Sequence, residues 1–196
     1  ESIKLKNGRD TTIIIRLTHH GPIITDVHNL LKGENNSMSM AWTGNWLTKE
    51  IDGLFDLAKS KNWSDFSRAV QKFGVPGQNI VYADVQGNIG WRPAVFIPIR
   101  KEGSSLIPRP GDDPSYDWSG RVPYKNMPFL LNPKKGYIAT ANNKTIDDSF
   151  PYYISGLWAD PSRAQQIVAR LDTMKKTTVD EMKSIQLDYT SLFAKE

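Results

Sequence analysis

Residues 136–143 read GYIATANN and residues 159–163 read ADPSR, and these two stretches are the most informative in the chain. The first is predicted to be a buried strand, Gly136–Ala141, that ends in two side-chain amides. The second is predicted to start a helix, with Asp160 as N-cap and a proline in the first turn. Amides at a strand end are suited to donate hydrogen bonds to a developing oxyanion, and an arginine nearby keeps its charge at any pH. The pair favours amide-bond hydrolysis, with a nucleophile that these stretches do not supply.

The composition narrows the classes of function. The 196 residues are enough for one domain with a hydrophobic core. Lys and Arg number 25 against 21 Asp and Glu, and the basic residues are scattered, which argues against a nucleic-acid partner. The chain has no cysteine, so a thiol nucleophile, a disulfide framework and a cysteine-based zinc site are excluded. No apolar run approaches the ~20 residues of a membrane helix, so no membrane contact is predicted.

Alternation of apolar residues predicts strands over residues 3–8 and 12–18, with a turn between them. A further strand is predicted over Ser37–Thr43. Ile80–Ala83 and Gly87–Trp91 are predicted to form a hairpin. Residues 100–135 are rich in proline, glycine and aspartate, and we expect a long loop that packs onto the rest of the domain through its aromatic and aliphatic side chains.

Helical periodicity is clear in four places. A helix predicted over Thr48–Ser60 has one apolar stripe, made of Ile51, Leu54, Phe55 and Ala58. The next helix is capped by Asn62 or Ser64 and ends at Gly74 and Pro76. Its buried face consists of Trp63, Phe66, Val70 and Phe73. The helix from Asp160 follows, and the last helix opens with a capping box over Thr178–Glu181.

Six short segments occur in the order and at about the spacing found in one enzyme family. They are THHGPII at 18–24, VYADVQGNIG at 81–90, YDWSG at 116–120, NPKKGYI at 132–138, ANN at 141–143, and ADPSR at 159–163. Each segment is weak by itself, but the ordered set is specific and extends over nearly the whole chain. On these motifs the sequence resembles the β-chain of the penicillin acylase (penicillin amidase) family of N-terminal nucleophile hydrolases.

The resemblance implies an α+β fold, mainly antiparallel sheet with helices, as part of the four-layer αββα sandwich of that family. Residues 1–196 would be a single domain and an internal segment of the β-chain. The implied activity is hydrolysis of the amide of a small acylated compound, such as a β-lactam side chain or an N-acyl homoserine lactone. The implied location is periplasmic or extracellular.

In the family, a serine at the mature β-chain N-terminus is the nucleophile and its own α-amine is the base. The α-amine pKa of about 7.7–8.0 suits that role near neutral pH. Ser2 lies in a stretch that matches an internal strand, so the nucleophile is expected upstream of Glu1. The isolated fragment is therefore expected to be inactive. It is expected to pair with the remaining α- and β-chain segments of its precursor, or to associate with itself.

The resemblance to the family implies two catalytic residues in this chain. Asn142 matches the family asparagine whose amide donates to the tetrahedral oxyanion, and Arg163 matches the arginine that orients this amide and the α-amine. The alternatives are a polar strand end for Asn142 and an exposed helix arginine for Arg163. No cofactor is expected in this segment. Calcium, which some members bind between their chains, is a candidate for the full-length protein, with Asp147 and Asp148 as candidate oxygen ligands, but Tyr152 stands where those members have an aspartate ligand.

Other polar residues are assigned structural roles. His20 is expected to satisfy a backbone group with its ring, and His19 and His28 to lie at the surface. No acidic residue stands near them at ligand spacing, so no zinc site is predicted. Asp84 is expected to cap its own turn. Two other functions remain open, a non-catalytic scaffold or binding module of the same fold and, because of the six tryptophans, a carbohydrate-binding β-rich domain.

Overall fold

The computed structural model describes residues 1–31, 33, 35–102 and 105–195 and has an α+β architecture in which all strand pairs are antiparallel. The helices are α1 (Glu50–Lys59), α2 (Trp63–Val70), α3 (Ser162–Asp172) and α4 (Val179–Gln186). The strands are β1 (Ser2–Lys4), β2 (Asp10–Thr12), β3 (Leu17–Thr18), β4 (Gly21–Pro22), β5 (Gln78–Ala83), β6 (Ile89–Ala94), β7 (Pro98–Arg100), β8 (Trp118–Arg121) and β9 (Leu130–Leu131). Short 3-10 turns occur at Thr43–Asn45, Pro114–Tyr116, Tyr124–Asn126 and Phe193–Lys195.

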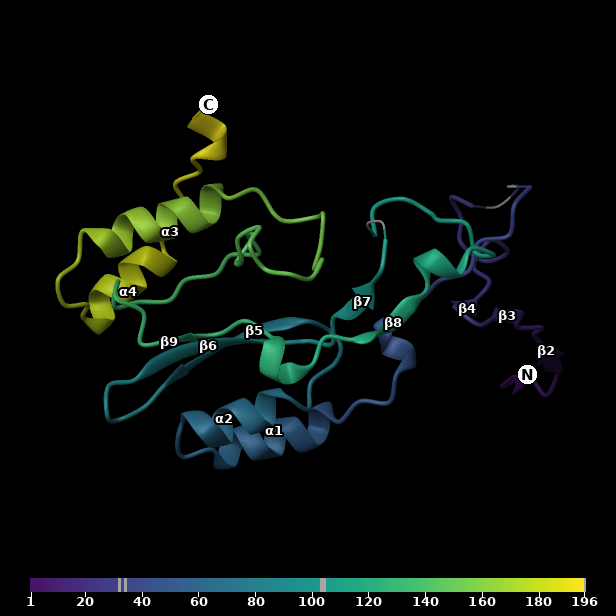
Figure 1. Ribbon diagram of the computed structural model, residues 1–196, viewed down its shortest axis with the longest axis horizontal. Helices are drawn as coiled ribbons and strands as arrows, with labels where there is room; N and C mark the ends of the chain where they lie inside the picture. The colour runs from purple at the N-terminus through teal and green to yellow at the C-terminus, as the bar shows by residue number, and fades with distance from the viewer. Residues whose placement is uncertain (32, 34, 103–104, 196) are drawn as a thin grey trace.

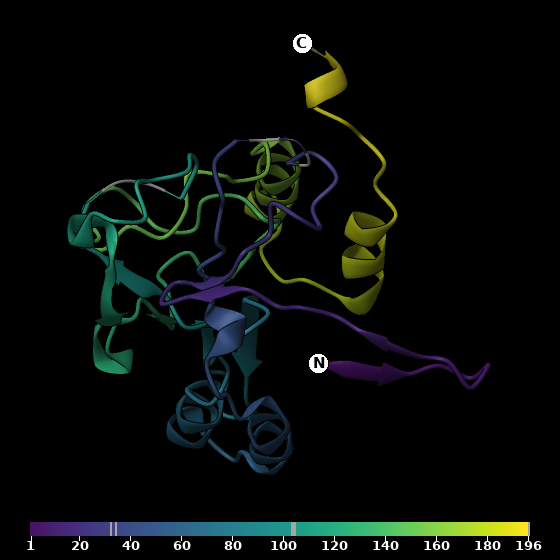
Figure 2. The same cartoon turned by 90° about the vertical axis from the view of Figure 1, so that its right-hand side faces the viewer.

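A three-stranded sheet, in the order β5-β6-β9, forms the centre of the molecule. Helices α1 and α2 lie on one side of this sheet, and α3 and α4 lie on the other (Figure 1). The β1–β2 hairpin projects away from the rest of the chain, as Figure 2 shows. The layers of helix and antiparallel sheet agree with the predicted fold class.

The main hydrophobic core lies between α2 and the β5–β6 hairpin. Phe66, Val70, Phe73 and Ala94 are buried there, and Trp63 packs against them. Asn62 caps α2, since its side chain accepts a hydrogen bond of 2.9 Å from the backbone N–H of Asp65. A glycine is required at position 90, because a Cβ atom there would come within 2.2 Å of the Trp63 ring. The predicted cap and buried face of this helix are confirmed, although α2 ends at Val70, before Gly74.

Several predicted strands are shorter than expected or absent. β1 and β2 pair Ser2 with Thr12, but the strand predicted over 12–18 is reduced to its two ends. Over Ser37–Thr43 the only pairing described is an isolated bridge between Ile23 and Ser39. The long loop predicted at 100–135 contains β8 and β9, apart from positions 103 and 104, which lie outside the described residues.

The prediction of a strand over Gly136–Ala141 is wrong. No described residue pairs with it in a ladder, although residues 137–140 are half-buried. A strand is defined by its hydrogen-bonded neighbour, so the pattern of side chains alone does not create one.

The apolar stripe predicted for α1 faces outward. Ile51, Leu54 and Phe55 are 66%, 54% and 64% exposed, whereas Gly53 is buried close to Phe73. The helix also begins at Glu50, two residues later than predicted. Periodicity identified the apolar face of α1 correctly, but it did not tell which side of the helix contacts the core of this chain.

The helix starts near the C-terminus were predicted closely. The N-cap of α3 is Pro161, one residue after the predicted Asp160, whose carboxylate instead accepts a hydrogen bond of 2.9 Å from the N–H of Ser162. The capping box of α4 is confirmed, because Thr178 and Glu181 exchange side-chain to backbone hydrogen bonds.

The chain exposes much more surface than a compact monomer of its mass. Its accessible area is 14263 Å², whereas a folded monomer of 22.1 kDa has about 9,300 Å². Large apolar side chains are prominent in the exposed area, on the N-terminal strands, on α1 and near the C-terminus. A chain of this shape has apolar surface available for other polypeptide.

The carboxylate of Glu50 joins α1 to the segment after α2. It accepts hydrogen bonds of 2.8 Å and 3.0 Å from the backbone N–H groups of Gly74 and Val75. Desolvation raises the pKa of this carboxyl, but the hydrogen bonds from Thr48, Gly74 and Val75 outweigh it and lower the pKa from 4.5 to about 2. The negative charge also lies in the first turn of α1, where the helix dipole favours it.

We predict that Glu50→Gln lowers the free energy of unfolding at neutral pH, and that the difference from wild type shrinks as the pH falls from 4.5 through 2. The sign follows because a depressed folded-state pKa stabilises above the unfolded-state pKa and loses this effect as the carboxylate is protonated. Urea unfolding across that pH range measures the difference in the free energy of unfolding. Asp52→Asn, which neutralises an exposed acid in the same helix, is the control. An equal pH dependence in the two variants would contradict the assignment.

Candidate active site around Asn142 and Arg163

Asn142 lies in a tight, left-handed part of the backbone. Its φ angle is +62°, a region that asparagine tolerates better than most other residues. Its carbonyl oxygen accepts a hydrogen bond of 3.0 Å from the N–H of Ala159. The side chain of Asn143 accepts one of 2.9 Å from the N–H of Ala141. The backbone around Asn142 is therefore fixed from both sides.

Arg163, in the first turn of α3, holds the side chain of Asn142. Its Nη2 atom donates a hydrogen bond of 2.8 Å to Oδ1 of Asn142 and one of 2.9 Å to the carbonyl oxygen of Ala141. The structure thus brings together the two residues singled out in the sequence, across a separation of 21 positions.

This contact determines which atoms of the amide are available. Oδ1 of Asn142 is the acceptor for Arg163, so the Nδ2 hydrogens point elsewhere. Among the described residues, Nδ2 makes no hydrogen bond, and both side chains are exposed. A fixed amide with free N–H groups is the arrangement that can donate to an oxyanion.

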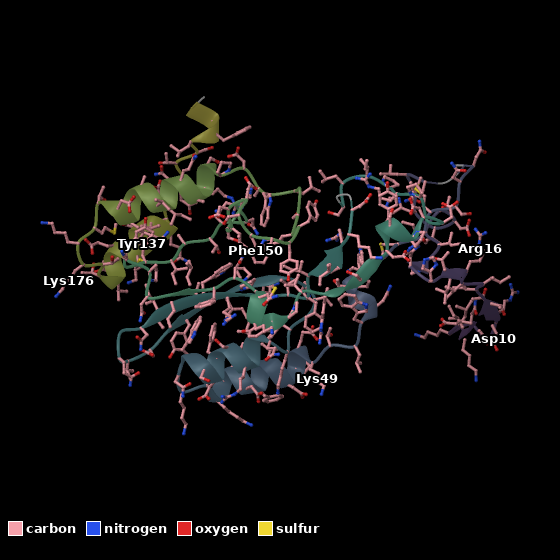
Figure 3. The ribbon with its side chains drawn as sticks, viewed as in Figure 1. Asp10, Arg16, Lys49, Tyr137, Phe150 and Lys176 are labelled. Carbon is pink, nitrogen blue, oxygen red and sulfur yellow. The ribbon has the colours of Figure 1, made fainter. Side chains whose placement is uncertain are left out.

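Helix α3 is itself anchored at two points. Tyr137, labelled in Figure 3, donates a hydrogen bond of 2.6 Å to Asp172 at the end of α3. Asp188, after α4, accepts hydrogen bonds of 2.8 Å from both Arg170 and Gln166. Hydrogen bonds from Thr190, Arg170 and Gln166 hold the pKa of Asp188 well below its usual range. These contacts fix the helix that presents Arg163.

The histidines are arranged differently from the prediction. Among the described residues, the ring of His20 makes no hydrogen bond to the backbone; its Nε2 atom lies 2.7 Å from Oδ1 of Asp117. The Nε2 atom of His19, which is exposed as expected, lies 3.4 Å from the same oxygen. The hydrogen bond from His20 is the main cause that lowers the pKa of Asp117. Sequence spacing missed Asp117 because it lies 97 residues from His20.

Asp84 has the structural role predicted for it. Its Oδ1 accepts hydrogen bonds from the backbone N–H groups of Gln86 and Asn88, at 3.0 Å and 2.9 Å, and so closes the β5–β6 turn. Its Oδ2 accepts from the hydroxyl of Tyr82 at 2.7 Å. All of these contacts lie within the hairpin, so Asp84 is not a catalytic candidate.

The acidic pair considered for calcium is engaged in local contacts. Asp147 accepts a hydrogen bond of 2.9 Å from the N–H of Ser149, and Asp148 forms an ion pair with Lys144. Calcium takes six to eight oxygen ligands. Within the described part of the chain, these two aspartates form no convergent cluster with a third acidic or histidine side chain. The calcium prediction stays a prediction for the full-length protein.

The tryptophans do not form an exposed row. Of the six, Trp91 is buried in the core and Trp42, at 49%, is the most exposed. Trp42, Trp46 and Trp118 line a cavity of about 960 Å³. A flat sugar-binding platform would need several exposed rings side by side, so this arrangement does not favour a carbohydrate-binding domain.

Comparison with known proteins identifies the family of the chain. The family model for penicillin amidase matches residues 1–196, the whole chain. The chain belongs to the penicillin amidase family. The family assignment made from the six sequence motifs is thereby confirmed.

Relatives within the penicillin amidase family have two kinds of name. The chain is 30% identical to the acyl-homoserine lactone acylase QuiP of Pseudomonas fluorescens over 99% of its length, which is 24% of that protein. It is 31% identical to penicillin G acylase of Escherichia coli, over 92% of the chain and 21% of that protein. The chain thus spans about a quarter of the length of the curated relatives it matches.

The structural comparison supports the same fold. The thermostable penicillin G acylase from Alcaligenes faecalis superposes with a TM-score of 0.73 and 26% identity, over 94% of this chain and 33% of that one. This match confirms the α+β fold class of the penicillin amidase family. None of the helices in the described parts of the chain has the length and apolar character of a membrane span.

We predict that Arg163→Ala loosens the backbone around Asn142 without unfolding the domain. Hydrogen exchange at the N–H groups of Ala159 and Ala141 should become faster, because the guanidinium no longer fixes the turn. The loss in overall stability should be at most about 1 kcal/mol, since the contact is exposed. Hydrogen-exchange mass spectrometry and urea unfolding measure the two effects. Arg163→Lys, which keeps the charge, should give a smaller change; unaltered exchange in the alanine variant would contradict the assignment.

Proposed function

We propose that this chain is part of an amidohydrolase that cleaves the amide of a small acylated compound. The support from relatives is that they are named acyl-homoserine lactone acylase and penicillin acylase. The observation that carries the proposal is the Asn142 amide, which Arg163 holds by its oxygen so that its N–H groups are free. Both named reactions begin with attack on an amide carbonyl, so both need a hydrogen-bond donor for the oxygen of the tetrahedral intermediate.

In the proposed mechanism, the nucleophile comes from polypeptide outside these 196 residues. A serine at a chain N-terminus attacks the amide carbonyl, and its own α-amine accepts the hydroxyl proton. As the tetrahedral intermediate forms, Nδ2 of Asn142 donates a hydrogen bond to the oxyanion. The α-amine then returns the proton to the leaving amine, and water hydrolyses the resulting ester. Under this proposal the isolated fragment has no activity.

Arg163 acts in this proposal as a positioning residue. Its guanidinium carries a permanent positive charge and lies 2.8 Å from Oδ1 of Asn142. The charge polarises the amide and makes its N–H groups better donors. A cation at this position also favours the neutral form of a nearby α-amine, which is the form that acts as a base.

The central prediction concerns Asn142→Asp in the complete protein that carries this chain. The carboxylate keeps an acceptor for Arg163 but has no N–H to donate, so kcat for amide hydrolysis should fall about 100- to 1,000-fold. Steady-state hydrolysis of an N-acyl homoserine lactone or a penicillin measures it, with circular dichroism to confirm folding.

Asn132→Asp is the matched control for this variant. Asn132 also has a left-handed backbone, with φ of +49°, and its Oδ1 accepts a hydrogen bond of 2.9 Å from the N–H of Ile89. Its Nδ2 donates a hydrogen bond of 2.8 Å to Oδ1 of Asn88, which aspartate cannot make, so this variant loses a structural N–H and should leave kcat unaltered. If Asn142→Asp keeps full turnover, Asn142 is not the oxyanion donor, and the non-catalytic scaffold becomes the better interpretation.

We also propose that the exposed apolar face of α1 is covered by the remaining α- and β-chain segments of the same precursor. The face consists of Ile51, Leu54 and Phe55, each more than half exposed. The chain spans about a quarter of its relatives' length, and its surface far exceeds that of a compact monomer. Self-association of the fragment through this face is the alternative, and a periplasmic or extracellular location is proposed by analogy with the family.

For this interface we predict that Phe55→Glu in the complete protein lowers the yield of folded, assembled enzyme, because a charge would be buried without a partner. Val85→Glu is the control, since Val85 stands alone at the β5–β6 turn and is 97% exposed. Size-exclusion chromatography of the purified variants compares the two. Equal yields would show that the α1 face stays in water.

A further inference from the structure

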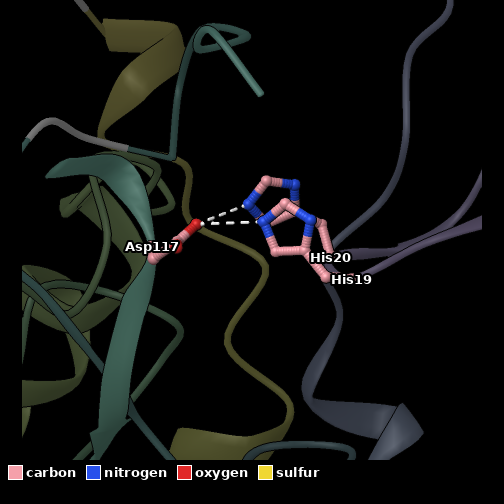
Figure 4. Close-up of side chains that lie close together, drawn as sticks. All are labelled: His19, His20 and Asp117. Carbon is pink, nitrogen blue, oxygen red and sulfur yellow. Dashed lines mark hydrogen bonds and ion pairs between the residues drawn. The ribbon is translucent and has the colours of Figure 1, made fainter. Parts of the chain in front are cut away.

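Three side chains with metal-binding atoms converge outside the proposed active site. His19 and His20 form the turn between β3 and β4, and Asp117 comes just before β8 (Figure 4). One ligand atom from each residue lies within 4.8 Å of the other two. Within the described part of the chain, this is the one group of three histidine or acidic side chains that converges in this way.

The turn places both imidazole rings on the same side. The hydroxyl of Thr18 donates a hydrogen bond of 3.1 Å to the carbonyl oxygen of Gly21 and accepts one of 3.2 Å from the N–H of His20. The His19 and His20 ring centroids are 3.7 Å apart. Their Nε2 atoms approach a single carboxylate oxygen, at 3.4 Å and 2.7 Å.

We propose that His19, His20 and Asp117 form a binding site for a divalent transition ion, and specifically for Zn²⁺. Ligand atoms around a tetrahedral zinc ion are about 3.3 Å apart, given zinc–ligand distances of about 2.0–2.1 Å. The three groups of this cluster reach that spacing with small side-chain rotations, because His19 and Asp117 are not packed on all sides. Two imidazole nitrogens and one carboxylate oxygen suit zinc, whereas calcium needs more oxygen ligands than the cluster offers.

The site is open on one side. The three residues line the cavity of about 960 Å³ together with Trp42, Trp46 and Trp118. The side chain of His19 is 64% exposed and that of Asp117 is 36% exposed, so an ion can enter from solvent. Three protein ligands leave one tetrahedral position for water or for a ligand in the cavity.

An ion pair between Asp117 and one histidine accounts for the arrangement less well than a bound metal ion does. One histidine is enough to pair with Asp117, and His20 already does so at 2.7 Å. The second, exposed ring also points its Nε2 atom at the same oxygen, at 3.4 Å, which is longer than a well-formed hydrogen bond. A metal ion between the three groups would account for the position of both rings, because each ring would then bind through a deprotonated nitrogen.

Cobalt(II) titration of the complete, metal-stripped protein tests the proposal. One equivalent of Co²⁺ should give the saturable visible absorption band of a four-coordinate site. Zn²⁺, but not Ca²⁺, should displace the Co²⁺ ion and abolish the band. His19→Ala and Asp117→Asn should each weaken Co²⁺ binding by more than about tenfold, because loss of a ligand costs more than loss of a supporting group. Both variants change exposed or isosteric groups, so they should fold, and circular dichroism verifies this.

His28→Ala is the matched control, since His28 is exposed and lies outside the cluster. It should leave the cobalt band intact. The proposal is overturned if no saturable band forms, if the band survives in Asp117→Asn, or if His28→Ala removes it. The readout is independent of amide hydrolysis, so a failure here does not affect the proposed function, and inactive enzyme can still be tested for the metal.

Discussion

Burial of the apolar face of α2 against the β5–β6 hairpin is the interaction on which the rest of this structure depends. Phe66, Val70 and Ala94 are removed from water there, and each large side chain so buried contributes about 1.5–3 kcal/mol. Other segments attach to this unit. β9 pairs with β6, and the hydroxyl of Tyr124 donates a hydrogen bond of 2.6 Å to the carbonyl oxygen of Ser67 in α2.

This core is small for the length of the chain. A second cluster around Ile97, Val122 and Met127 adds to it, but the N-terminal strands and the apolar face of α1 remain in water. Such surface is costly to leave exposed. The proposal that further polypeptide of the same precursor covers it rests on this imbalance together with the length of the relatives.

The candidate site shows how two distant segments become one chemical unit. A left-handed asparagine and an arginine from the first turn of α3 are joined by one hydrogen bond, which occupies the amide oxygen and frees the amide nitrogen. The sequence indicated both residues, through the resemblance to a family. It did not indicate which end of the amide the arginine would hold, because that depends on the side-chain orientation of both residues.

Local features of this protein were determined by the sequence. The Asn62 cap, the Asp84 turn and the Thr178–Glu181 capping box each involve atoms a few residues apart, so nearby side chains suffice to specify them. Tertiary structure alone decided the features that join distant segments. Within the described part of the chain the Gly136–Ala141 stretch has no strand partner, α1 turns its apolar stripe outward, and Asp117 meets His19 and His20 across nearly a hundred residues. Strand pairing and side-chain convergence each depend on two segments of the chain, so the residue pattern within one segment cannot specify them.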